Sequence, residues 1–287
     1  MKLVRYGEPG HERPGLWLDS ADSPGILDVR GMAFDINDYD AHFFSHHGIE
    51  RVAALARENK RKEIPADSVR IGPPIARPGK IICVGKNYAE HAKEFDSVIP
   101  ASPVLFSKAT TSLNGPFDPI SIRPDASSTD AEVELAVVIG STAFRISETD
   151  AMKYVTGFTI VNDVTDRDAQ KAGLQWFRGK SFDSFCPMGP WLITTDEWNN
   201  FSGTNLTSRL NGEILQSGNT RDMMFGVASL ISFISQSITL EAGDVIATGT
   251  PSGVGFARNP PVLLKDGDEI ECAVEGIGAI RNRVKAI

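Results

Sequence analysis

Three acidic residues at alternate positions precede an apolar run in the segment 130–139, which reads DAEVELAVVI. Leu135–Ile139 predicts a buried strand, and side chains alternate along a strand, so Asp130, Glu132 and Glu134 are expected on one face. Converging carboxylates repel one another without a cation, and carboxylate oxygens suit a hard divalent ion. The pattern therefore favours Mg²⁺, Mn²⁺ or Ca²⁺ over zinc. Taken alone, it also fits a solvated strand edge whose acids face water.

A second acidic group follows the next predicted strand, in the segment 162–168 (NDVTDRD). The strand is predicted over residues 154–161, and the end of a strand can present a side chain to a metal ion. The segment could therefore supply a further oxygen ligand to a cation held by the first group.

His91 and Glu94 are three residues apart in a segment that runs from a predicted strand through a glycine turn into a predicted helix. At this spacing the two side chains can touch. A carboxylate beside an imidazole fixes its tautomer and raises its basicity, as a general base for water requires. The alternative is an ordinary pair on the surface of the helix, because such pairs are common.

The elements that must position these residues are short strands joined by glycine- and proline-rich connections, without regular alternation of strands and helices. This pattern of predicted elements indicates an α+β fold rather than a doubly wound sheet. Turn signals divide the chain into a small N-terminal domain, 1–72, and a catalytic domain, 73–287. Strands are expected over 80–84, 132–139, 154–161, 244–248, 262–264 and 269–274, and helices over 38–62, 88–95 and 223–235.

Composition narrows the class of protein. The 287 residues include 41% hydrophobic and 23% charged residues, which is too apolar for a disordered chain. The net charge of −8 argues against a nucleic-acid partner. Three scattered cysteines indicate neither a disulfide framework nor a zinc site. Neither a signal peptide nor a membrane span is apparent, so we expect a cytoplasmic protein that acts on a small molecule.

Six segments, in this order, resemble the fumarylacetoacetate hydrolase family. They are KIICVGKNYAEHAKEF, PVLFSKATTSLNGP, DAEVELAVVIG, GFTIVNDVTDRDAQ, RGKSFDSFCPMGPWLIT and LEAGDVIATGTPSGVG, within residues 80–287. The resemblance implies a strand-rich catalytic domain, a mixed β-sandwich or roll, behind a small N-terminal α+β domain. It also implies a homodimer.

The resemblance also implies roles for individual residues. A divalent cation, usually Mg²⁺ and sometimes Mn²⁺ or Ca²⁺, would be held by Glu132, Glu134 and Asp163. The implied catalytic residues are His91, Glu94 and Lys180. The implied substrate-binding residues are Arg167, Gln170, Thr250 and, more weakly, Lys108. Some family members have a further acidic ligand where this chain has Val84.

The activity implied is hydrolysis of a carbon–carbon bond in a β-diketo acid, with His91 and Glu94 activating water. The substrate would be an acylpyruvate or a 2,4-diketo-3-deoxy sugar acid, cleaved to a 2-oxo acid such as pyruvate and a carboxylic acid. Other members are oxaloacetate decarboxylases, isomerases or lyases, and these alternatives stay open. A protein of another class, which binds a metal or ligand without catalysis, also stays open.

Overall fold

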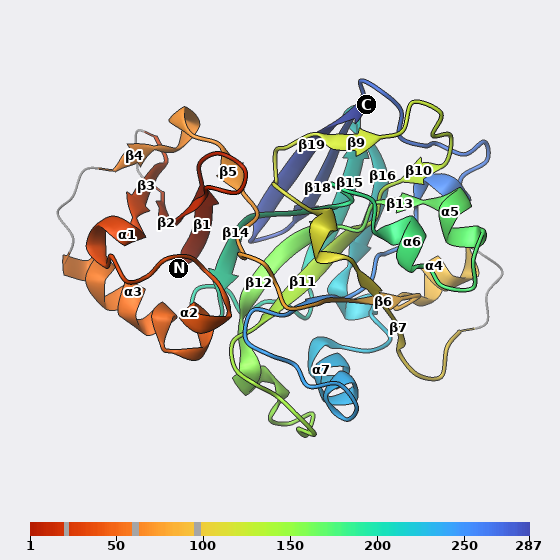
Figure 1. Ribbon diagram of the computed structural model, residues 1–287. Helices are drawn as coiled ribbons and strands as arrows, with labels where there is room; N and C mark the ends of the chain where they lie inside the picture. The colour runs from red at the N-terminus through yellow and green to blue at the C-terminus, as the bar shows by residue number, and fades with distance from the viewer. Residues whose placement is uncertain (20–22, 59–62, 95–98) are drawn as a thin grey trace.

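Two β-sheets pack against each other at the centre of the computed structural model, which describes residues 1–19, 23–58, 63–94 and 99–287 (Figure 1). The larger sheet crosses the whole molecule, and the smaller one covers part of it. Buried apolar side chains from both sheets form the main core. This strand-rich architecture with a small N-terminal region confirms the α+β prediction.

The larger sheet has a main path of ten strands. In spatial order these are β4 (Ile64–Pro65), β3 (Gly25–Asp28), β2 (Arg13–Leu18), β1 (Lys2–Tyr6), β14 (Cys186–Thr194), β12 (Val155–Asn162), β11 (Val133–Ile139), β17 (Val245–Ala247), β6 (Ile81–Gly85) and β7 (Val104–Lys108). Two short strands pair beside this path, β5 (Ile71–Gly72) with β1 and β8 (Leu113–Asn114) with β14.

The smaller sheet has five strands. Their order is β16 (Glu213–Asn219), β15 (Asn205–Leu210), β18 (Glu269–Val274), β19 (Gly278–Ala286) and β9 (Ile120–Ile122). A separate two-stranded ladder joins β10 (Thr129–Asp130) to β13 (Thr165–Asp166). The described α-helices are α1 (Val29–Met32), α2 (Ala41–Ser45), α3 (Gly48–Glu58), α4 (Ala89–Lys93), α5 (Arg167–Lys171), α6 (Phe177–Lys180) and α7 (Val227–Ser235).

The two central strands of the larger sheet, β11 and β12, have almost continuously apolar sequences. Every residue of β11 is buried, because β12 and β17 flank it within the sheet and β15 and β18 of the smaller sheet pack against it. A strand covered on both faces needs apolar side chains on both. The polar residues of this region, Glu134 and Asn162, stand where the two strands begin and end.

The N-terminal region extends the larger sheet through β1, which pairs with β14 in antiparallel register. Its apolar side chains join a second core that also includes residues of β6, β11 and β17. The domain boundary at residue 72 stays a prediction. No helix in the described residues combines the length and apolarity needed to cross a bilayer.

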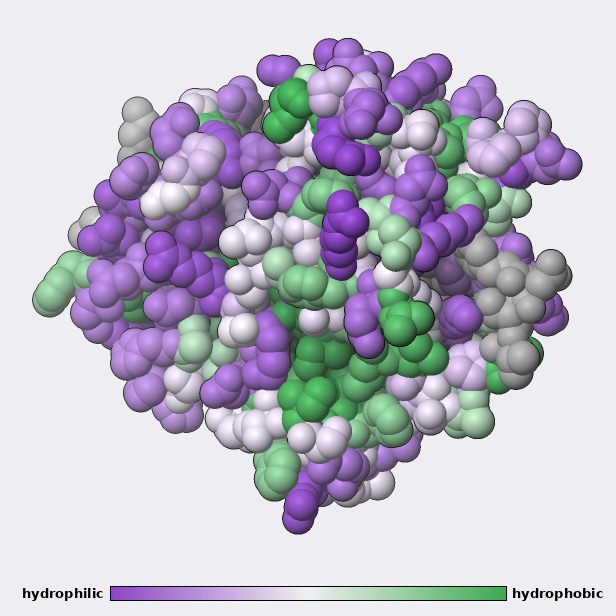
Figure 2. Space-filling model, turned by 45° about the vertical axis from the view of Figure 1, so that its right-hand side comes forward, coloured by the Kyte–Doolittle hydropathy of each residue, from purple (hydrophilic) through white to green (hydrophobic). Residues whose placement is uncertain are grey.

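The surface carries mainly hydrophilic side chains over the N-terminal region, while hydrophobic side chains gather low on the face shown in Figure 2. Helix α7 lies low in Figure 1, and its Phe233 is 41% exposed. The homodimer implied by the family resemblance stays a prediction.

Several predicted elements differ in detail. The helix expected over 38–62 is two helices, α2 and α3, because the chain turns at His47, whose φ is +58°. Residues 262–264 are not a strand; the N–H groups of Val262 and Leu264 instead donate to the carbonyls of Gly255 and Thr129. The helix over 223–235 begins at Val227. The ends of the predicted helices at 59–62 and 95 lie outside the described residues.

Close packing of β12 on β14 predicts that Gly157→Ala destabilises the protein. A Cβ at Gly157 would lie 2.2 Å from the carbonyl oxygen of Ile193. We expect the free energy of unfolding, measured by denaturant titration, to fall by about 1–3 kcal/mol, as for overpacked cores. Gly173→Ala is the control, because its Cβ would meet no atom closer than 3.8 Å. Equal stability of the two variants would contradict this interpretation.

Candidate active site

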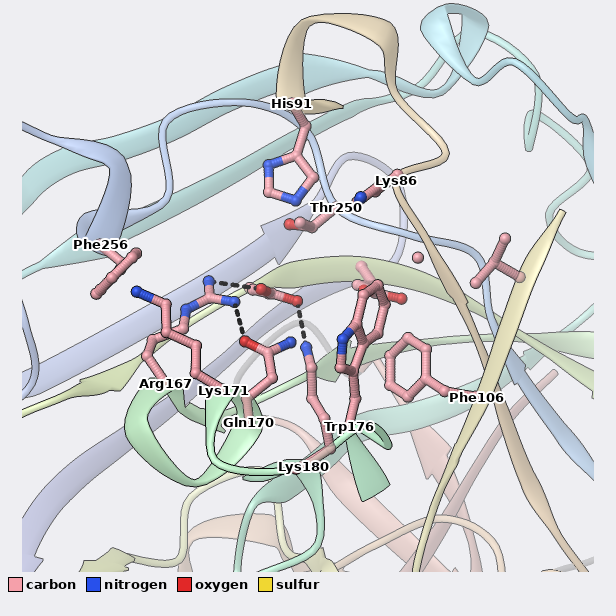
Figure 3. A pocket seen from close by; sticks show the side chains of 15 residues that line it. Lys86, His91, Phe106, Arg167, Gln170, Lys171, Trp176, Lys180, Thr250 and Phe256 are labelled. Atoms are coloured by element: carbon pink, nitrogen blue, oxygen red, sulfur yellow. Dashed lines mark hydrogen bonds and ion pairs between the residues drawn. The ribbon is translucent and has the colours of Figure 1, made fainter. Parts of the chain in front are cut away.

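A cavity of about 390 Å³ opens where β6, β11, α4, α5 and α6 meet the turn after β17. Figure 3 shows side chains from these separate segments pointing into it. The predicted site residues that line it are His91, Glu132, Glu134, Arg167, Gln170, Lys180 and Thr250. The remaining ones lie behind the lining: Glu94 contacts His91, and Lys108 contacts Asp163.

The deepest feature of the cavity is an acidic group, defined as Glu132, Glu134 and Asp163. Oxygen atoms from the three carboxylates lie within 4.8 Å of one another, and all three residues are buried. The antiparallel pairing of β11 with β12 creates this group: the Asp163 N–H donates to the Glu132 carbonyl (2.9 Å), and the Asn162 side chain accepts from the Glu132 N–H (3.0 Å).

Three buried basic side chains, those of Lys180, Lys108 and Arg167, contact this acidic group. The Lys180 ammonium lies 2.7 Å from Glu132 and 2.5 Å from Asp163. Lys108 donates to the other oxygen of Asp163 at 2.6 Å. The Arg167 guanidinium lies 2.6 Å from Glu132. Ion pairs of this kind offset the cost of placing charge in a low-dielectric interior.

The pKa values of Glu132 and Glu134 are shifted in opposite directions. Burial alone would raise the pKa of Glu132, but Lys180 and Arg167 outweigh it and hold that pKa below its usual range. Burial, together with the charges of Asp163 and Glu132, raises the pKa of Glu134 well above its usual value. The pKa of Lys180 is raised because Asp163 and Glu132 outweigh its burial, so the ammonium stays charged.

A divalent cation fits this donor set. Three oxygen donors converge, and the carboxyl of Glu134 has only the N–H of Gly249, at 2.8 Å, as a described hydrogen-bond donor. All-oxygen coordination is the chemistry that Mg²⁺, Mn²⁺ and Ca²⁺ prefer. The buried Glu/Glu/Asp group thus suits a hard divalent ion, and Glu132, Glu134 and Asp163 would hold it.

His91 and Glu94 form the pair expected from their spacing. The Nδ1 atom of His91 lies 3.0 Å from a carboxylate oxygen of Glu94. An ionised carboxylate only accepts, so Nδ1 carries the proton. The second ring nitrogen points down into the cavity (Figure 3). Glu94 also accepts from the N–H of Gly253 at 2.6 Å, which ties α4 to the turn after β17.

Asp130 is a positioning residue that the sequence pattern placed with the two glutamates. It lies instead in β10 and accepts from Nε and an NH₂ group of Arg167, at 3.1 and 2.6 Å. It also accepts from the N–H groups of Gly255 and Phe256. One buried carboxylate therefore fixes both the guanidinium and the neighbouring turn. Gln170, one turn along α5, accepts from Arg167 at 3.2 Å.

Thr250 lines the cavity, but its hydroxyl is already committed to structural hydrogen bonds. It donates to the Val133 carbonyl at 2.9 Å and accepts from the Gln216 amide at 2.7 Å. Gln216, from β16, also accepts from the Val133 N–H at 3.1 Å. The smaller sheet thereby holds the strand that carries Glu132 and Glu134. No local sequence signal singles out Gln216, because its partners are remote in the chain.

Other lining residues were also absent from the sequence predictions. Lys86 and Lys171 add positive charge, and Phe106, Trp176 and Phe256 add aromatic surface. The ring centroids of Phe106 and Trp176 lie 5.3 Å apart, so these two form one aromatic wall. The Lys86 position, directly after a strand and a glycine, was the one available signal, since binding residues often follow strand ends.

The raised pKa of Glu134 predicts pH-dependent metal binding. The metal-free carboxyl holds a proton that the cation must displace, so affinity rises with pH and binding releases a proton. Calorimetric titration with Mn²⁺ in buffers of different ionisation enthalpy measures both. Glu134→Gln should weaken binding by more than about tenfold. The exposed Glu148→Gln is the control, and unchanged affinity in Glu134→Gln would remove the residue from the site.

The comparisons with known proteins agree on the family of this chain. Residues 80–285 match the family model described as "Fumarylacetoacetate (FAA) hydrolase C-terminal". The mitochondrial oxaloacetate tautomerase Fahd2a of Rattus norvegicus is 42% identical over 288 residues, covering 99% of this chain and 91% of its own. The Homo sapiens protein FAHD2A, with the same activity in its name, is 41% identical over 287 residues, with the same coverage of both chains.

Solved structures of similar proteins carry two kinds of activity in their titles. A fumarylacetoacetate hydrolase from Exiguobacterium antarcticum is 39% identical, with a TM-score of 0.82 and full coverage of both chains. A 5-carboxymethyl-2-hydroxymuconate delta-isomerase from Mycobacterium smegmatis is 32% identical, with a TM-score of 0.79 and coverage of 100% and 99%. The chain therefore belongs to the fumarylacetoacetate hydrolase family.

Proposed function

We propose that this protein is a divalent-metal-dependent tautomerase that interconverts the keto and enol forms of oxaloacetate or a closely similar 2-oxo acid. The observation that carries the proposal is the placement of the acidic group and His91 in one cavity. The names of the relatives that match nearly the whole chain support the substrate. The isomerase among the similar structures supports the reaction class.

Keto–enol tautomerisation moves one proton and adds or removes no other atom. A proton leaves carbon 3, and the 2-oxo oxygen gains one. A divalent cation held by the acidic group would supply the Lewis acid that polarises the 2-oxo group. The reaction therefore needs a base near carbon 3, groups that orient the carboxylate, and no water as a reactant.

The residues of the cavity can fill these roles. His91 takes the proton of carbon 3 on its second ring nitrogen and delivers it to the 2-oxo oxygen, and Glu94 stabilises the imidazolium formed in between. The Arg167 guanidinium, held by Asp130, orients the substrate carboxylate with Gln170 beside it. Lys180 stays charged at the floor and offsets the negative charge that develops on oxygen.

Hydrolysis of a β-diketo acid is the second candidate, and the pair of His91 and Glu94 is the observation that favours it. The same imidazole can deprotonate water as readily as carbon 3. One similar structure is described as a hydrolase. Oxaloacetate decarboxylation would use the same polarised 2-oxo group but needs no base at carbon 3.

The first test follows the enol of oxaloacetate by its ultraviolet absorbance. Protein with Mg²⁺ or Mn²⁺ should accelerate its conversion to the keto form, and EDTA should abolish the effect. His91→Gln should lower kcat by about 10²–10⁴, the usual contribution of a general base. The exposed His42→Gln is the control and should match the wild type.

The same reactions are assayed for pyruvate and carbon dioxide, with acetylpyruvate as a parallel substrate. Tautomerisation forms neither product. Metal-dependent cleavage of acetylpyruvate, without acceleration of oxaloacetate ketonisation, would replace the proposal with the hydrolase. Release of carbon dioxide from oxaloacetate at the rate of enol loss would replace it with the decarboxylase.

A further inference from the structure

Two lysines on the cavity wall are not used by the acidic group. Within the described part of the chain, neither Lys86 nor Lys171 makes an ion pair, although both line the cavity. Lys108, Lys180 and Arg167, in contrast, each contact a buried carboxylate. The ammonium group of Lys86 is therefore available to a ligand, whereas that of Lys171 lies 4.1 Å from the centre of the Phe256 ring.

The charge balance of the site favours a ligand with more than one negative charge. Its buried carboxylates are Asp130, Glu132, Glu134 and Asp163, and its buried basic side chains are Lys108, Arg167 and Lys180. With the cation bound, these four carboxylates and that of Glu94 carry five negative charges, which the three basic side chains and the divalent ion balance. Lys86 and Lys171 then add two positive charges, which a dianion offsets better than a monoanion does.

The backbone holds Lys86 in a conformation that aims its side chain into the cavity. Its φ is +56°, in the left-handed region, which is unfavourable for a residue other than glycine. Such a conformation persists when its surroundings impose it. The next residue does so: buried Asn87 donates to the carbonyls of Thr248 (2.8 Å) and Phe225 (3.0 Å) and accepts from the Phe225 N–H.

Lys86 lies across the cavity from the groups that we propose to orient the substrate carboxylate next to the 2-oxo group. Figure 3 shows its ammonium beside Thr250 and below His91, whereas Arg167, Gln170, Lys171 and Lys180 lie on the other side. The aromatic wall of Phe106 and Trp176 flanks the space between them. Trp176 also packs on Gly85, where a Cβ would lie 2.5 Å from its ring, so the wall lies directly against the residue before Lys86.

We infer that Lys86 binds the second carboxylate of a dicarboxylic 2-oxo acid and thereby selects dianionic substrates over monoanionic ones. The inference rests on the proposed function and names the substrate class of the same site. A 2-oxo acid bound at Arg167 and the acidic group extends its carbon 3 past His91 and its second carboxylate to Lys86. Charge-assisted hydrogen bonds from the ammonium then fix the far end.

The test compares oxaloacetate with 2-oxobutyrate, which has a methyl group in place of the second carboxylate. Exchange of carbon 3 protons for deuterium, followed by NMR, reports the same chemistry for both. Lys86→Met should raise KM for oxaloacetate about 10–100-fold, the worth of a hydrogen bond to a charged group. Its kcat should change less, and the kinetics of 2-oxobutyrate should stay as in the wild type.

Two further variants separate charge from structure. Lys86→Arg keeps a cation at the site and should restore most of the preference for oxaloacetate. Lys265→Met removes an exposed lysine that is not part of the cavity wall and should leave both substrates unaffected. An equal loss for oxaloacetate and 2-oxobutyrate in Lys86→Met would overturn the inference.

A binding measurement distinguishes failure of this inference from failure of the proposed function. Malate and 2-hydroxybutyrate repeat the two carbon skeletons and cannot enolise. Calorimetry on Mn²⁺-loaded protein should show tighter binding of malate, and Lys86→Met should remove the difference. If that result holds without turnover of oxaloacetate, the inference stands and the tautomerase proposal fails. If the protein turns over oxaloacetate but Lys86→Met prefers malate as strongly as the wild type does, the inference fails and the tautomerase proposal stands.

Discussion

The mutual repulsion of three buried carboxylates is the constraint on which the rest of this structure depends. Glu132, Glu134 and Asp163 lie too close together, and too far from water, to be ionised without compensation. Lys108 and Lys180 supply part of it, and a divalent cation would supply the remainder. A site of this kind can be kept only where the surrounding backbone is rigid, because small displacements change such energies strongly.

The two sheets provide that rigidity by fixing one short strand from both sides. The register of β11 with β12 brings Asp163 to the two glutamates. Gln216 of the smaller sheet holds the backbone of Val133 between them. Asp130 then orients Arg167 beside the group. Residues that never touch a ligand thus determine where the ligand atoms are bound, as outer-shell partners do in other metal sites.

One arrangement of groups could serve the proposed tautomerisation and both alternatives, because each would begin with a polarised 2-oxo group. Tautomerisation, hydrolysis and decarboxylation would differ in what His91 deprotonates and in whether water reaches the substrate. The hydrogen bond from Gly253 to Glu94 connects the pair of His91 and Glu94 to the turn after β17, so the position of that turn helps to orient His91. The family fold alone does not decide among these reactions.

Local patterns in the chain were enough to predict the strand-rich fold class, the alternation of Glu132 with Glu134 and the contact of His91 with Glu94. Each depends on the period of a single strand or helix. The break at His47 was missed, because apolar periodicity does not report a left-handed residue. The roles of Asp130 and Lys86 were also missed. Asp130 finds its partners in β13 and α5, and Lys86 is held by its neighbour Asn87, whose partners are Phe225 and Thr248; only tertiary folding brings such distant segments together.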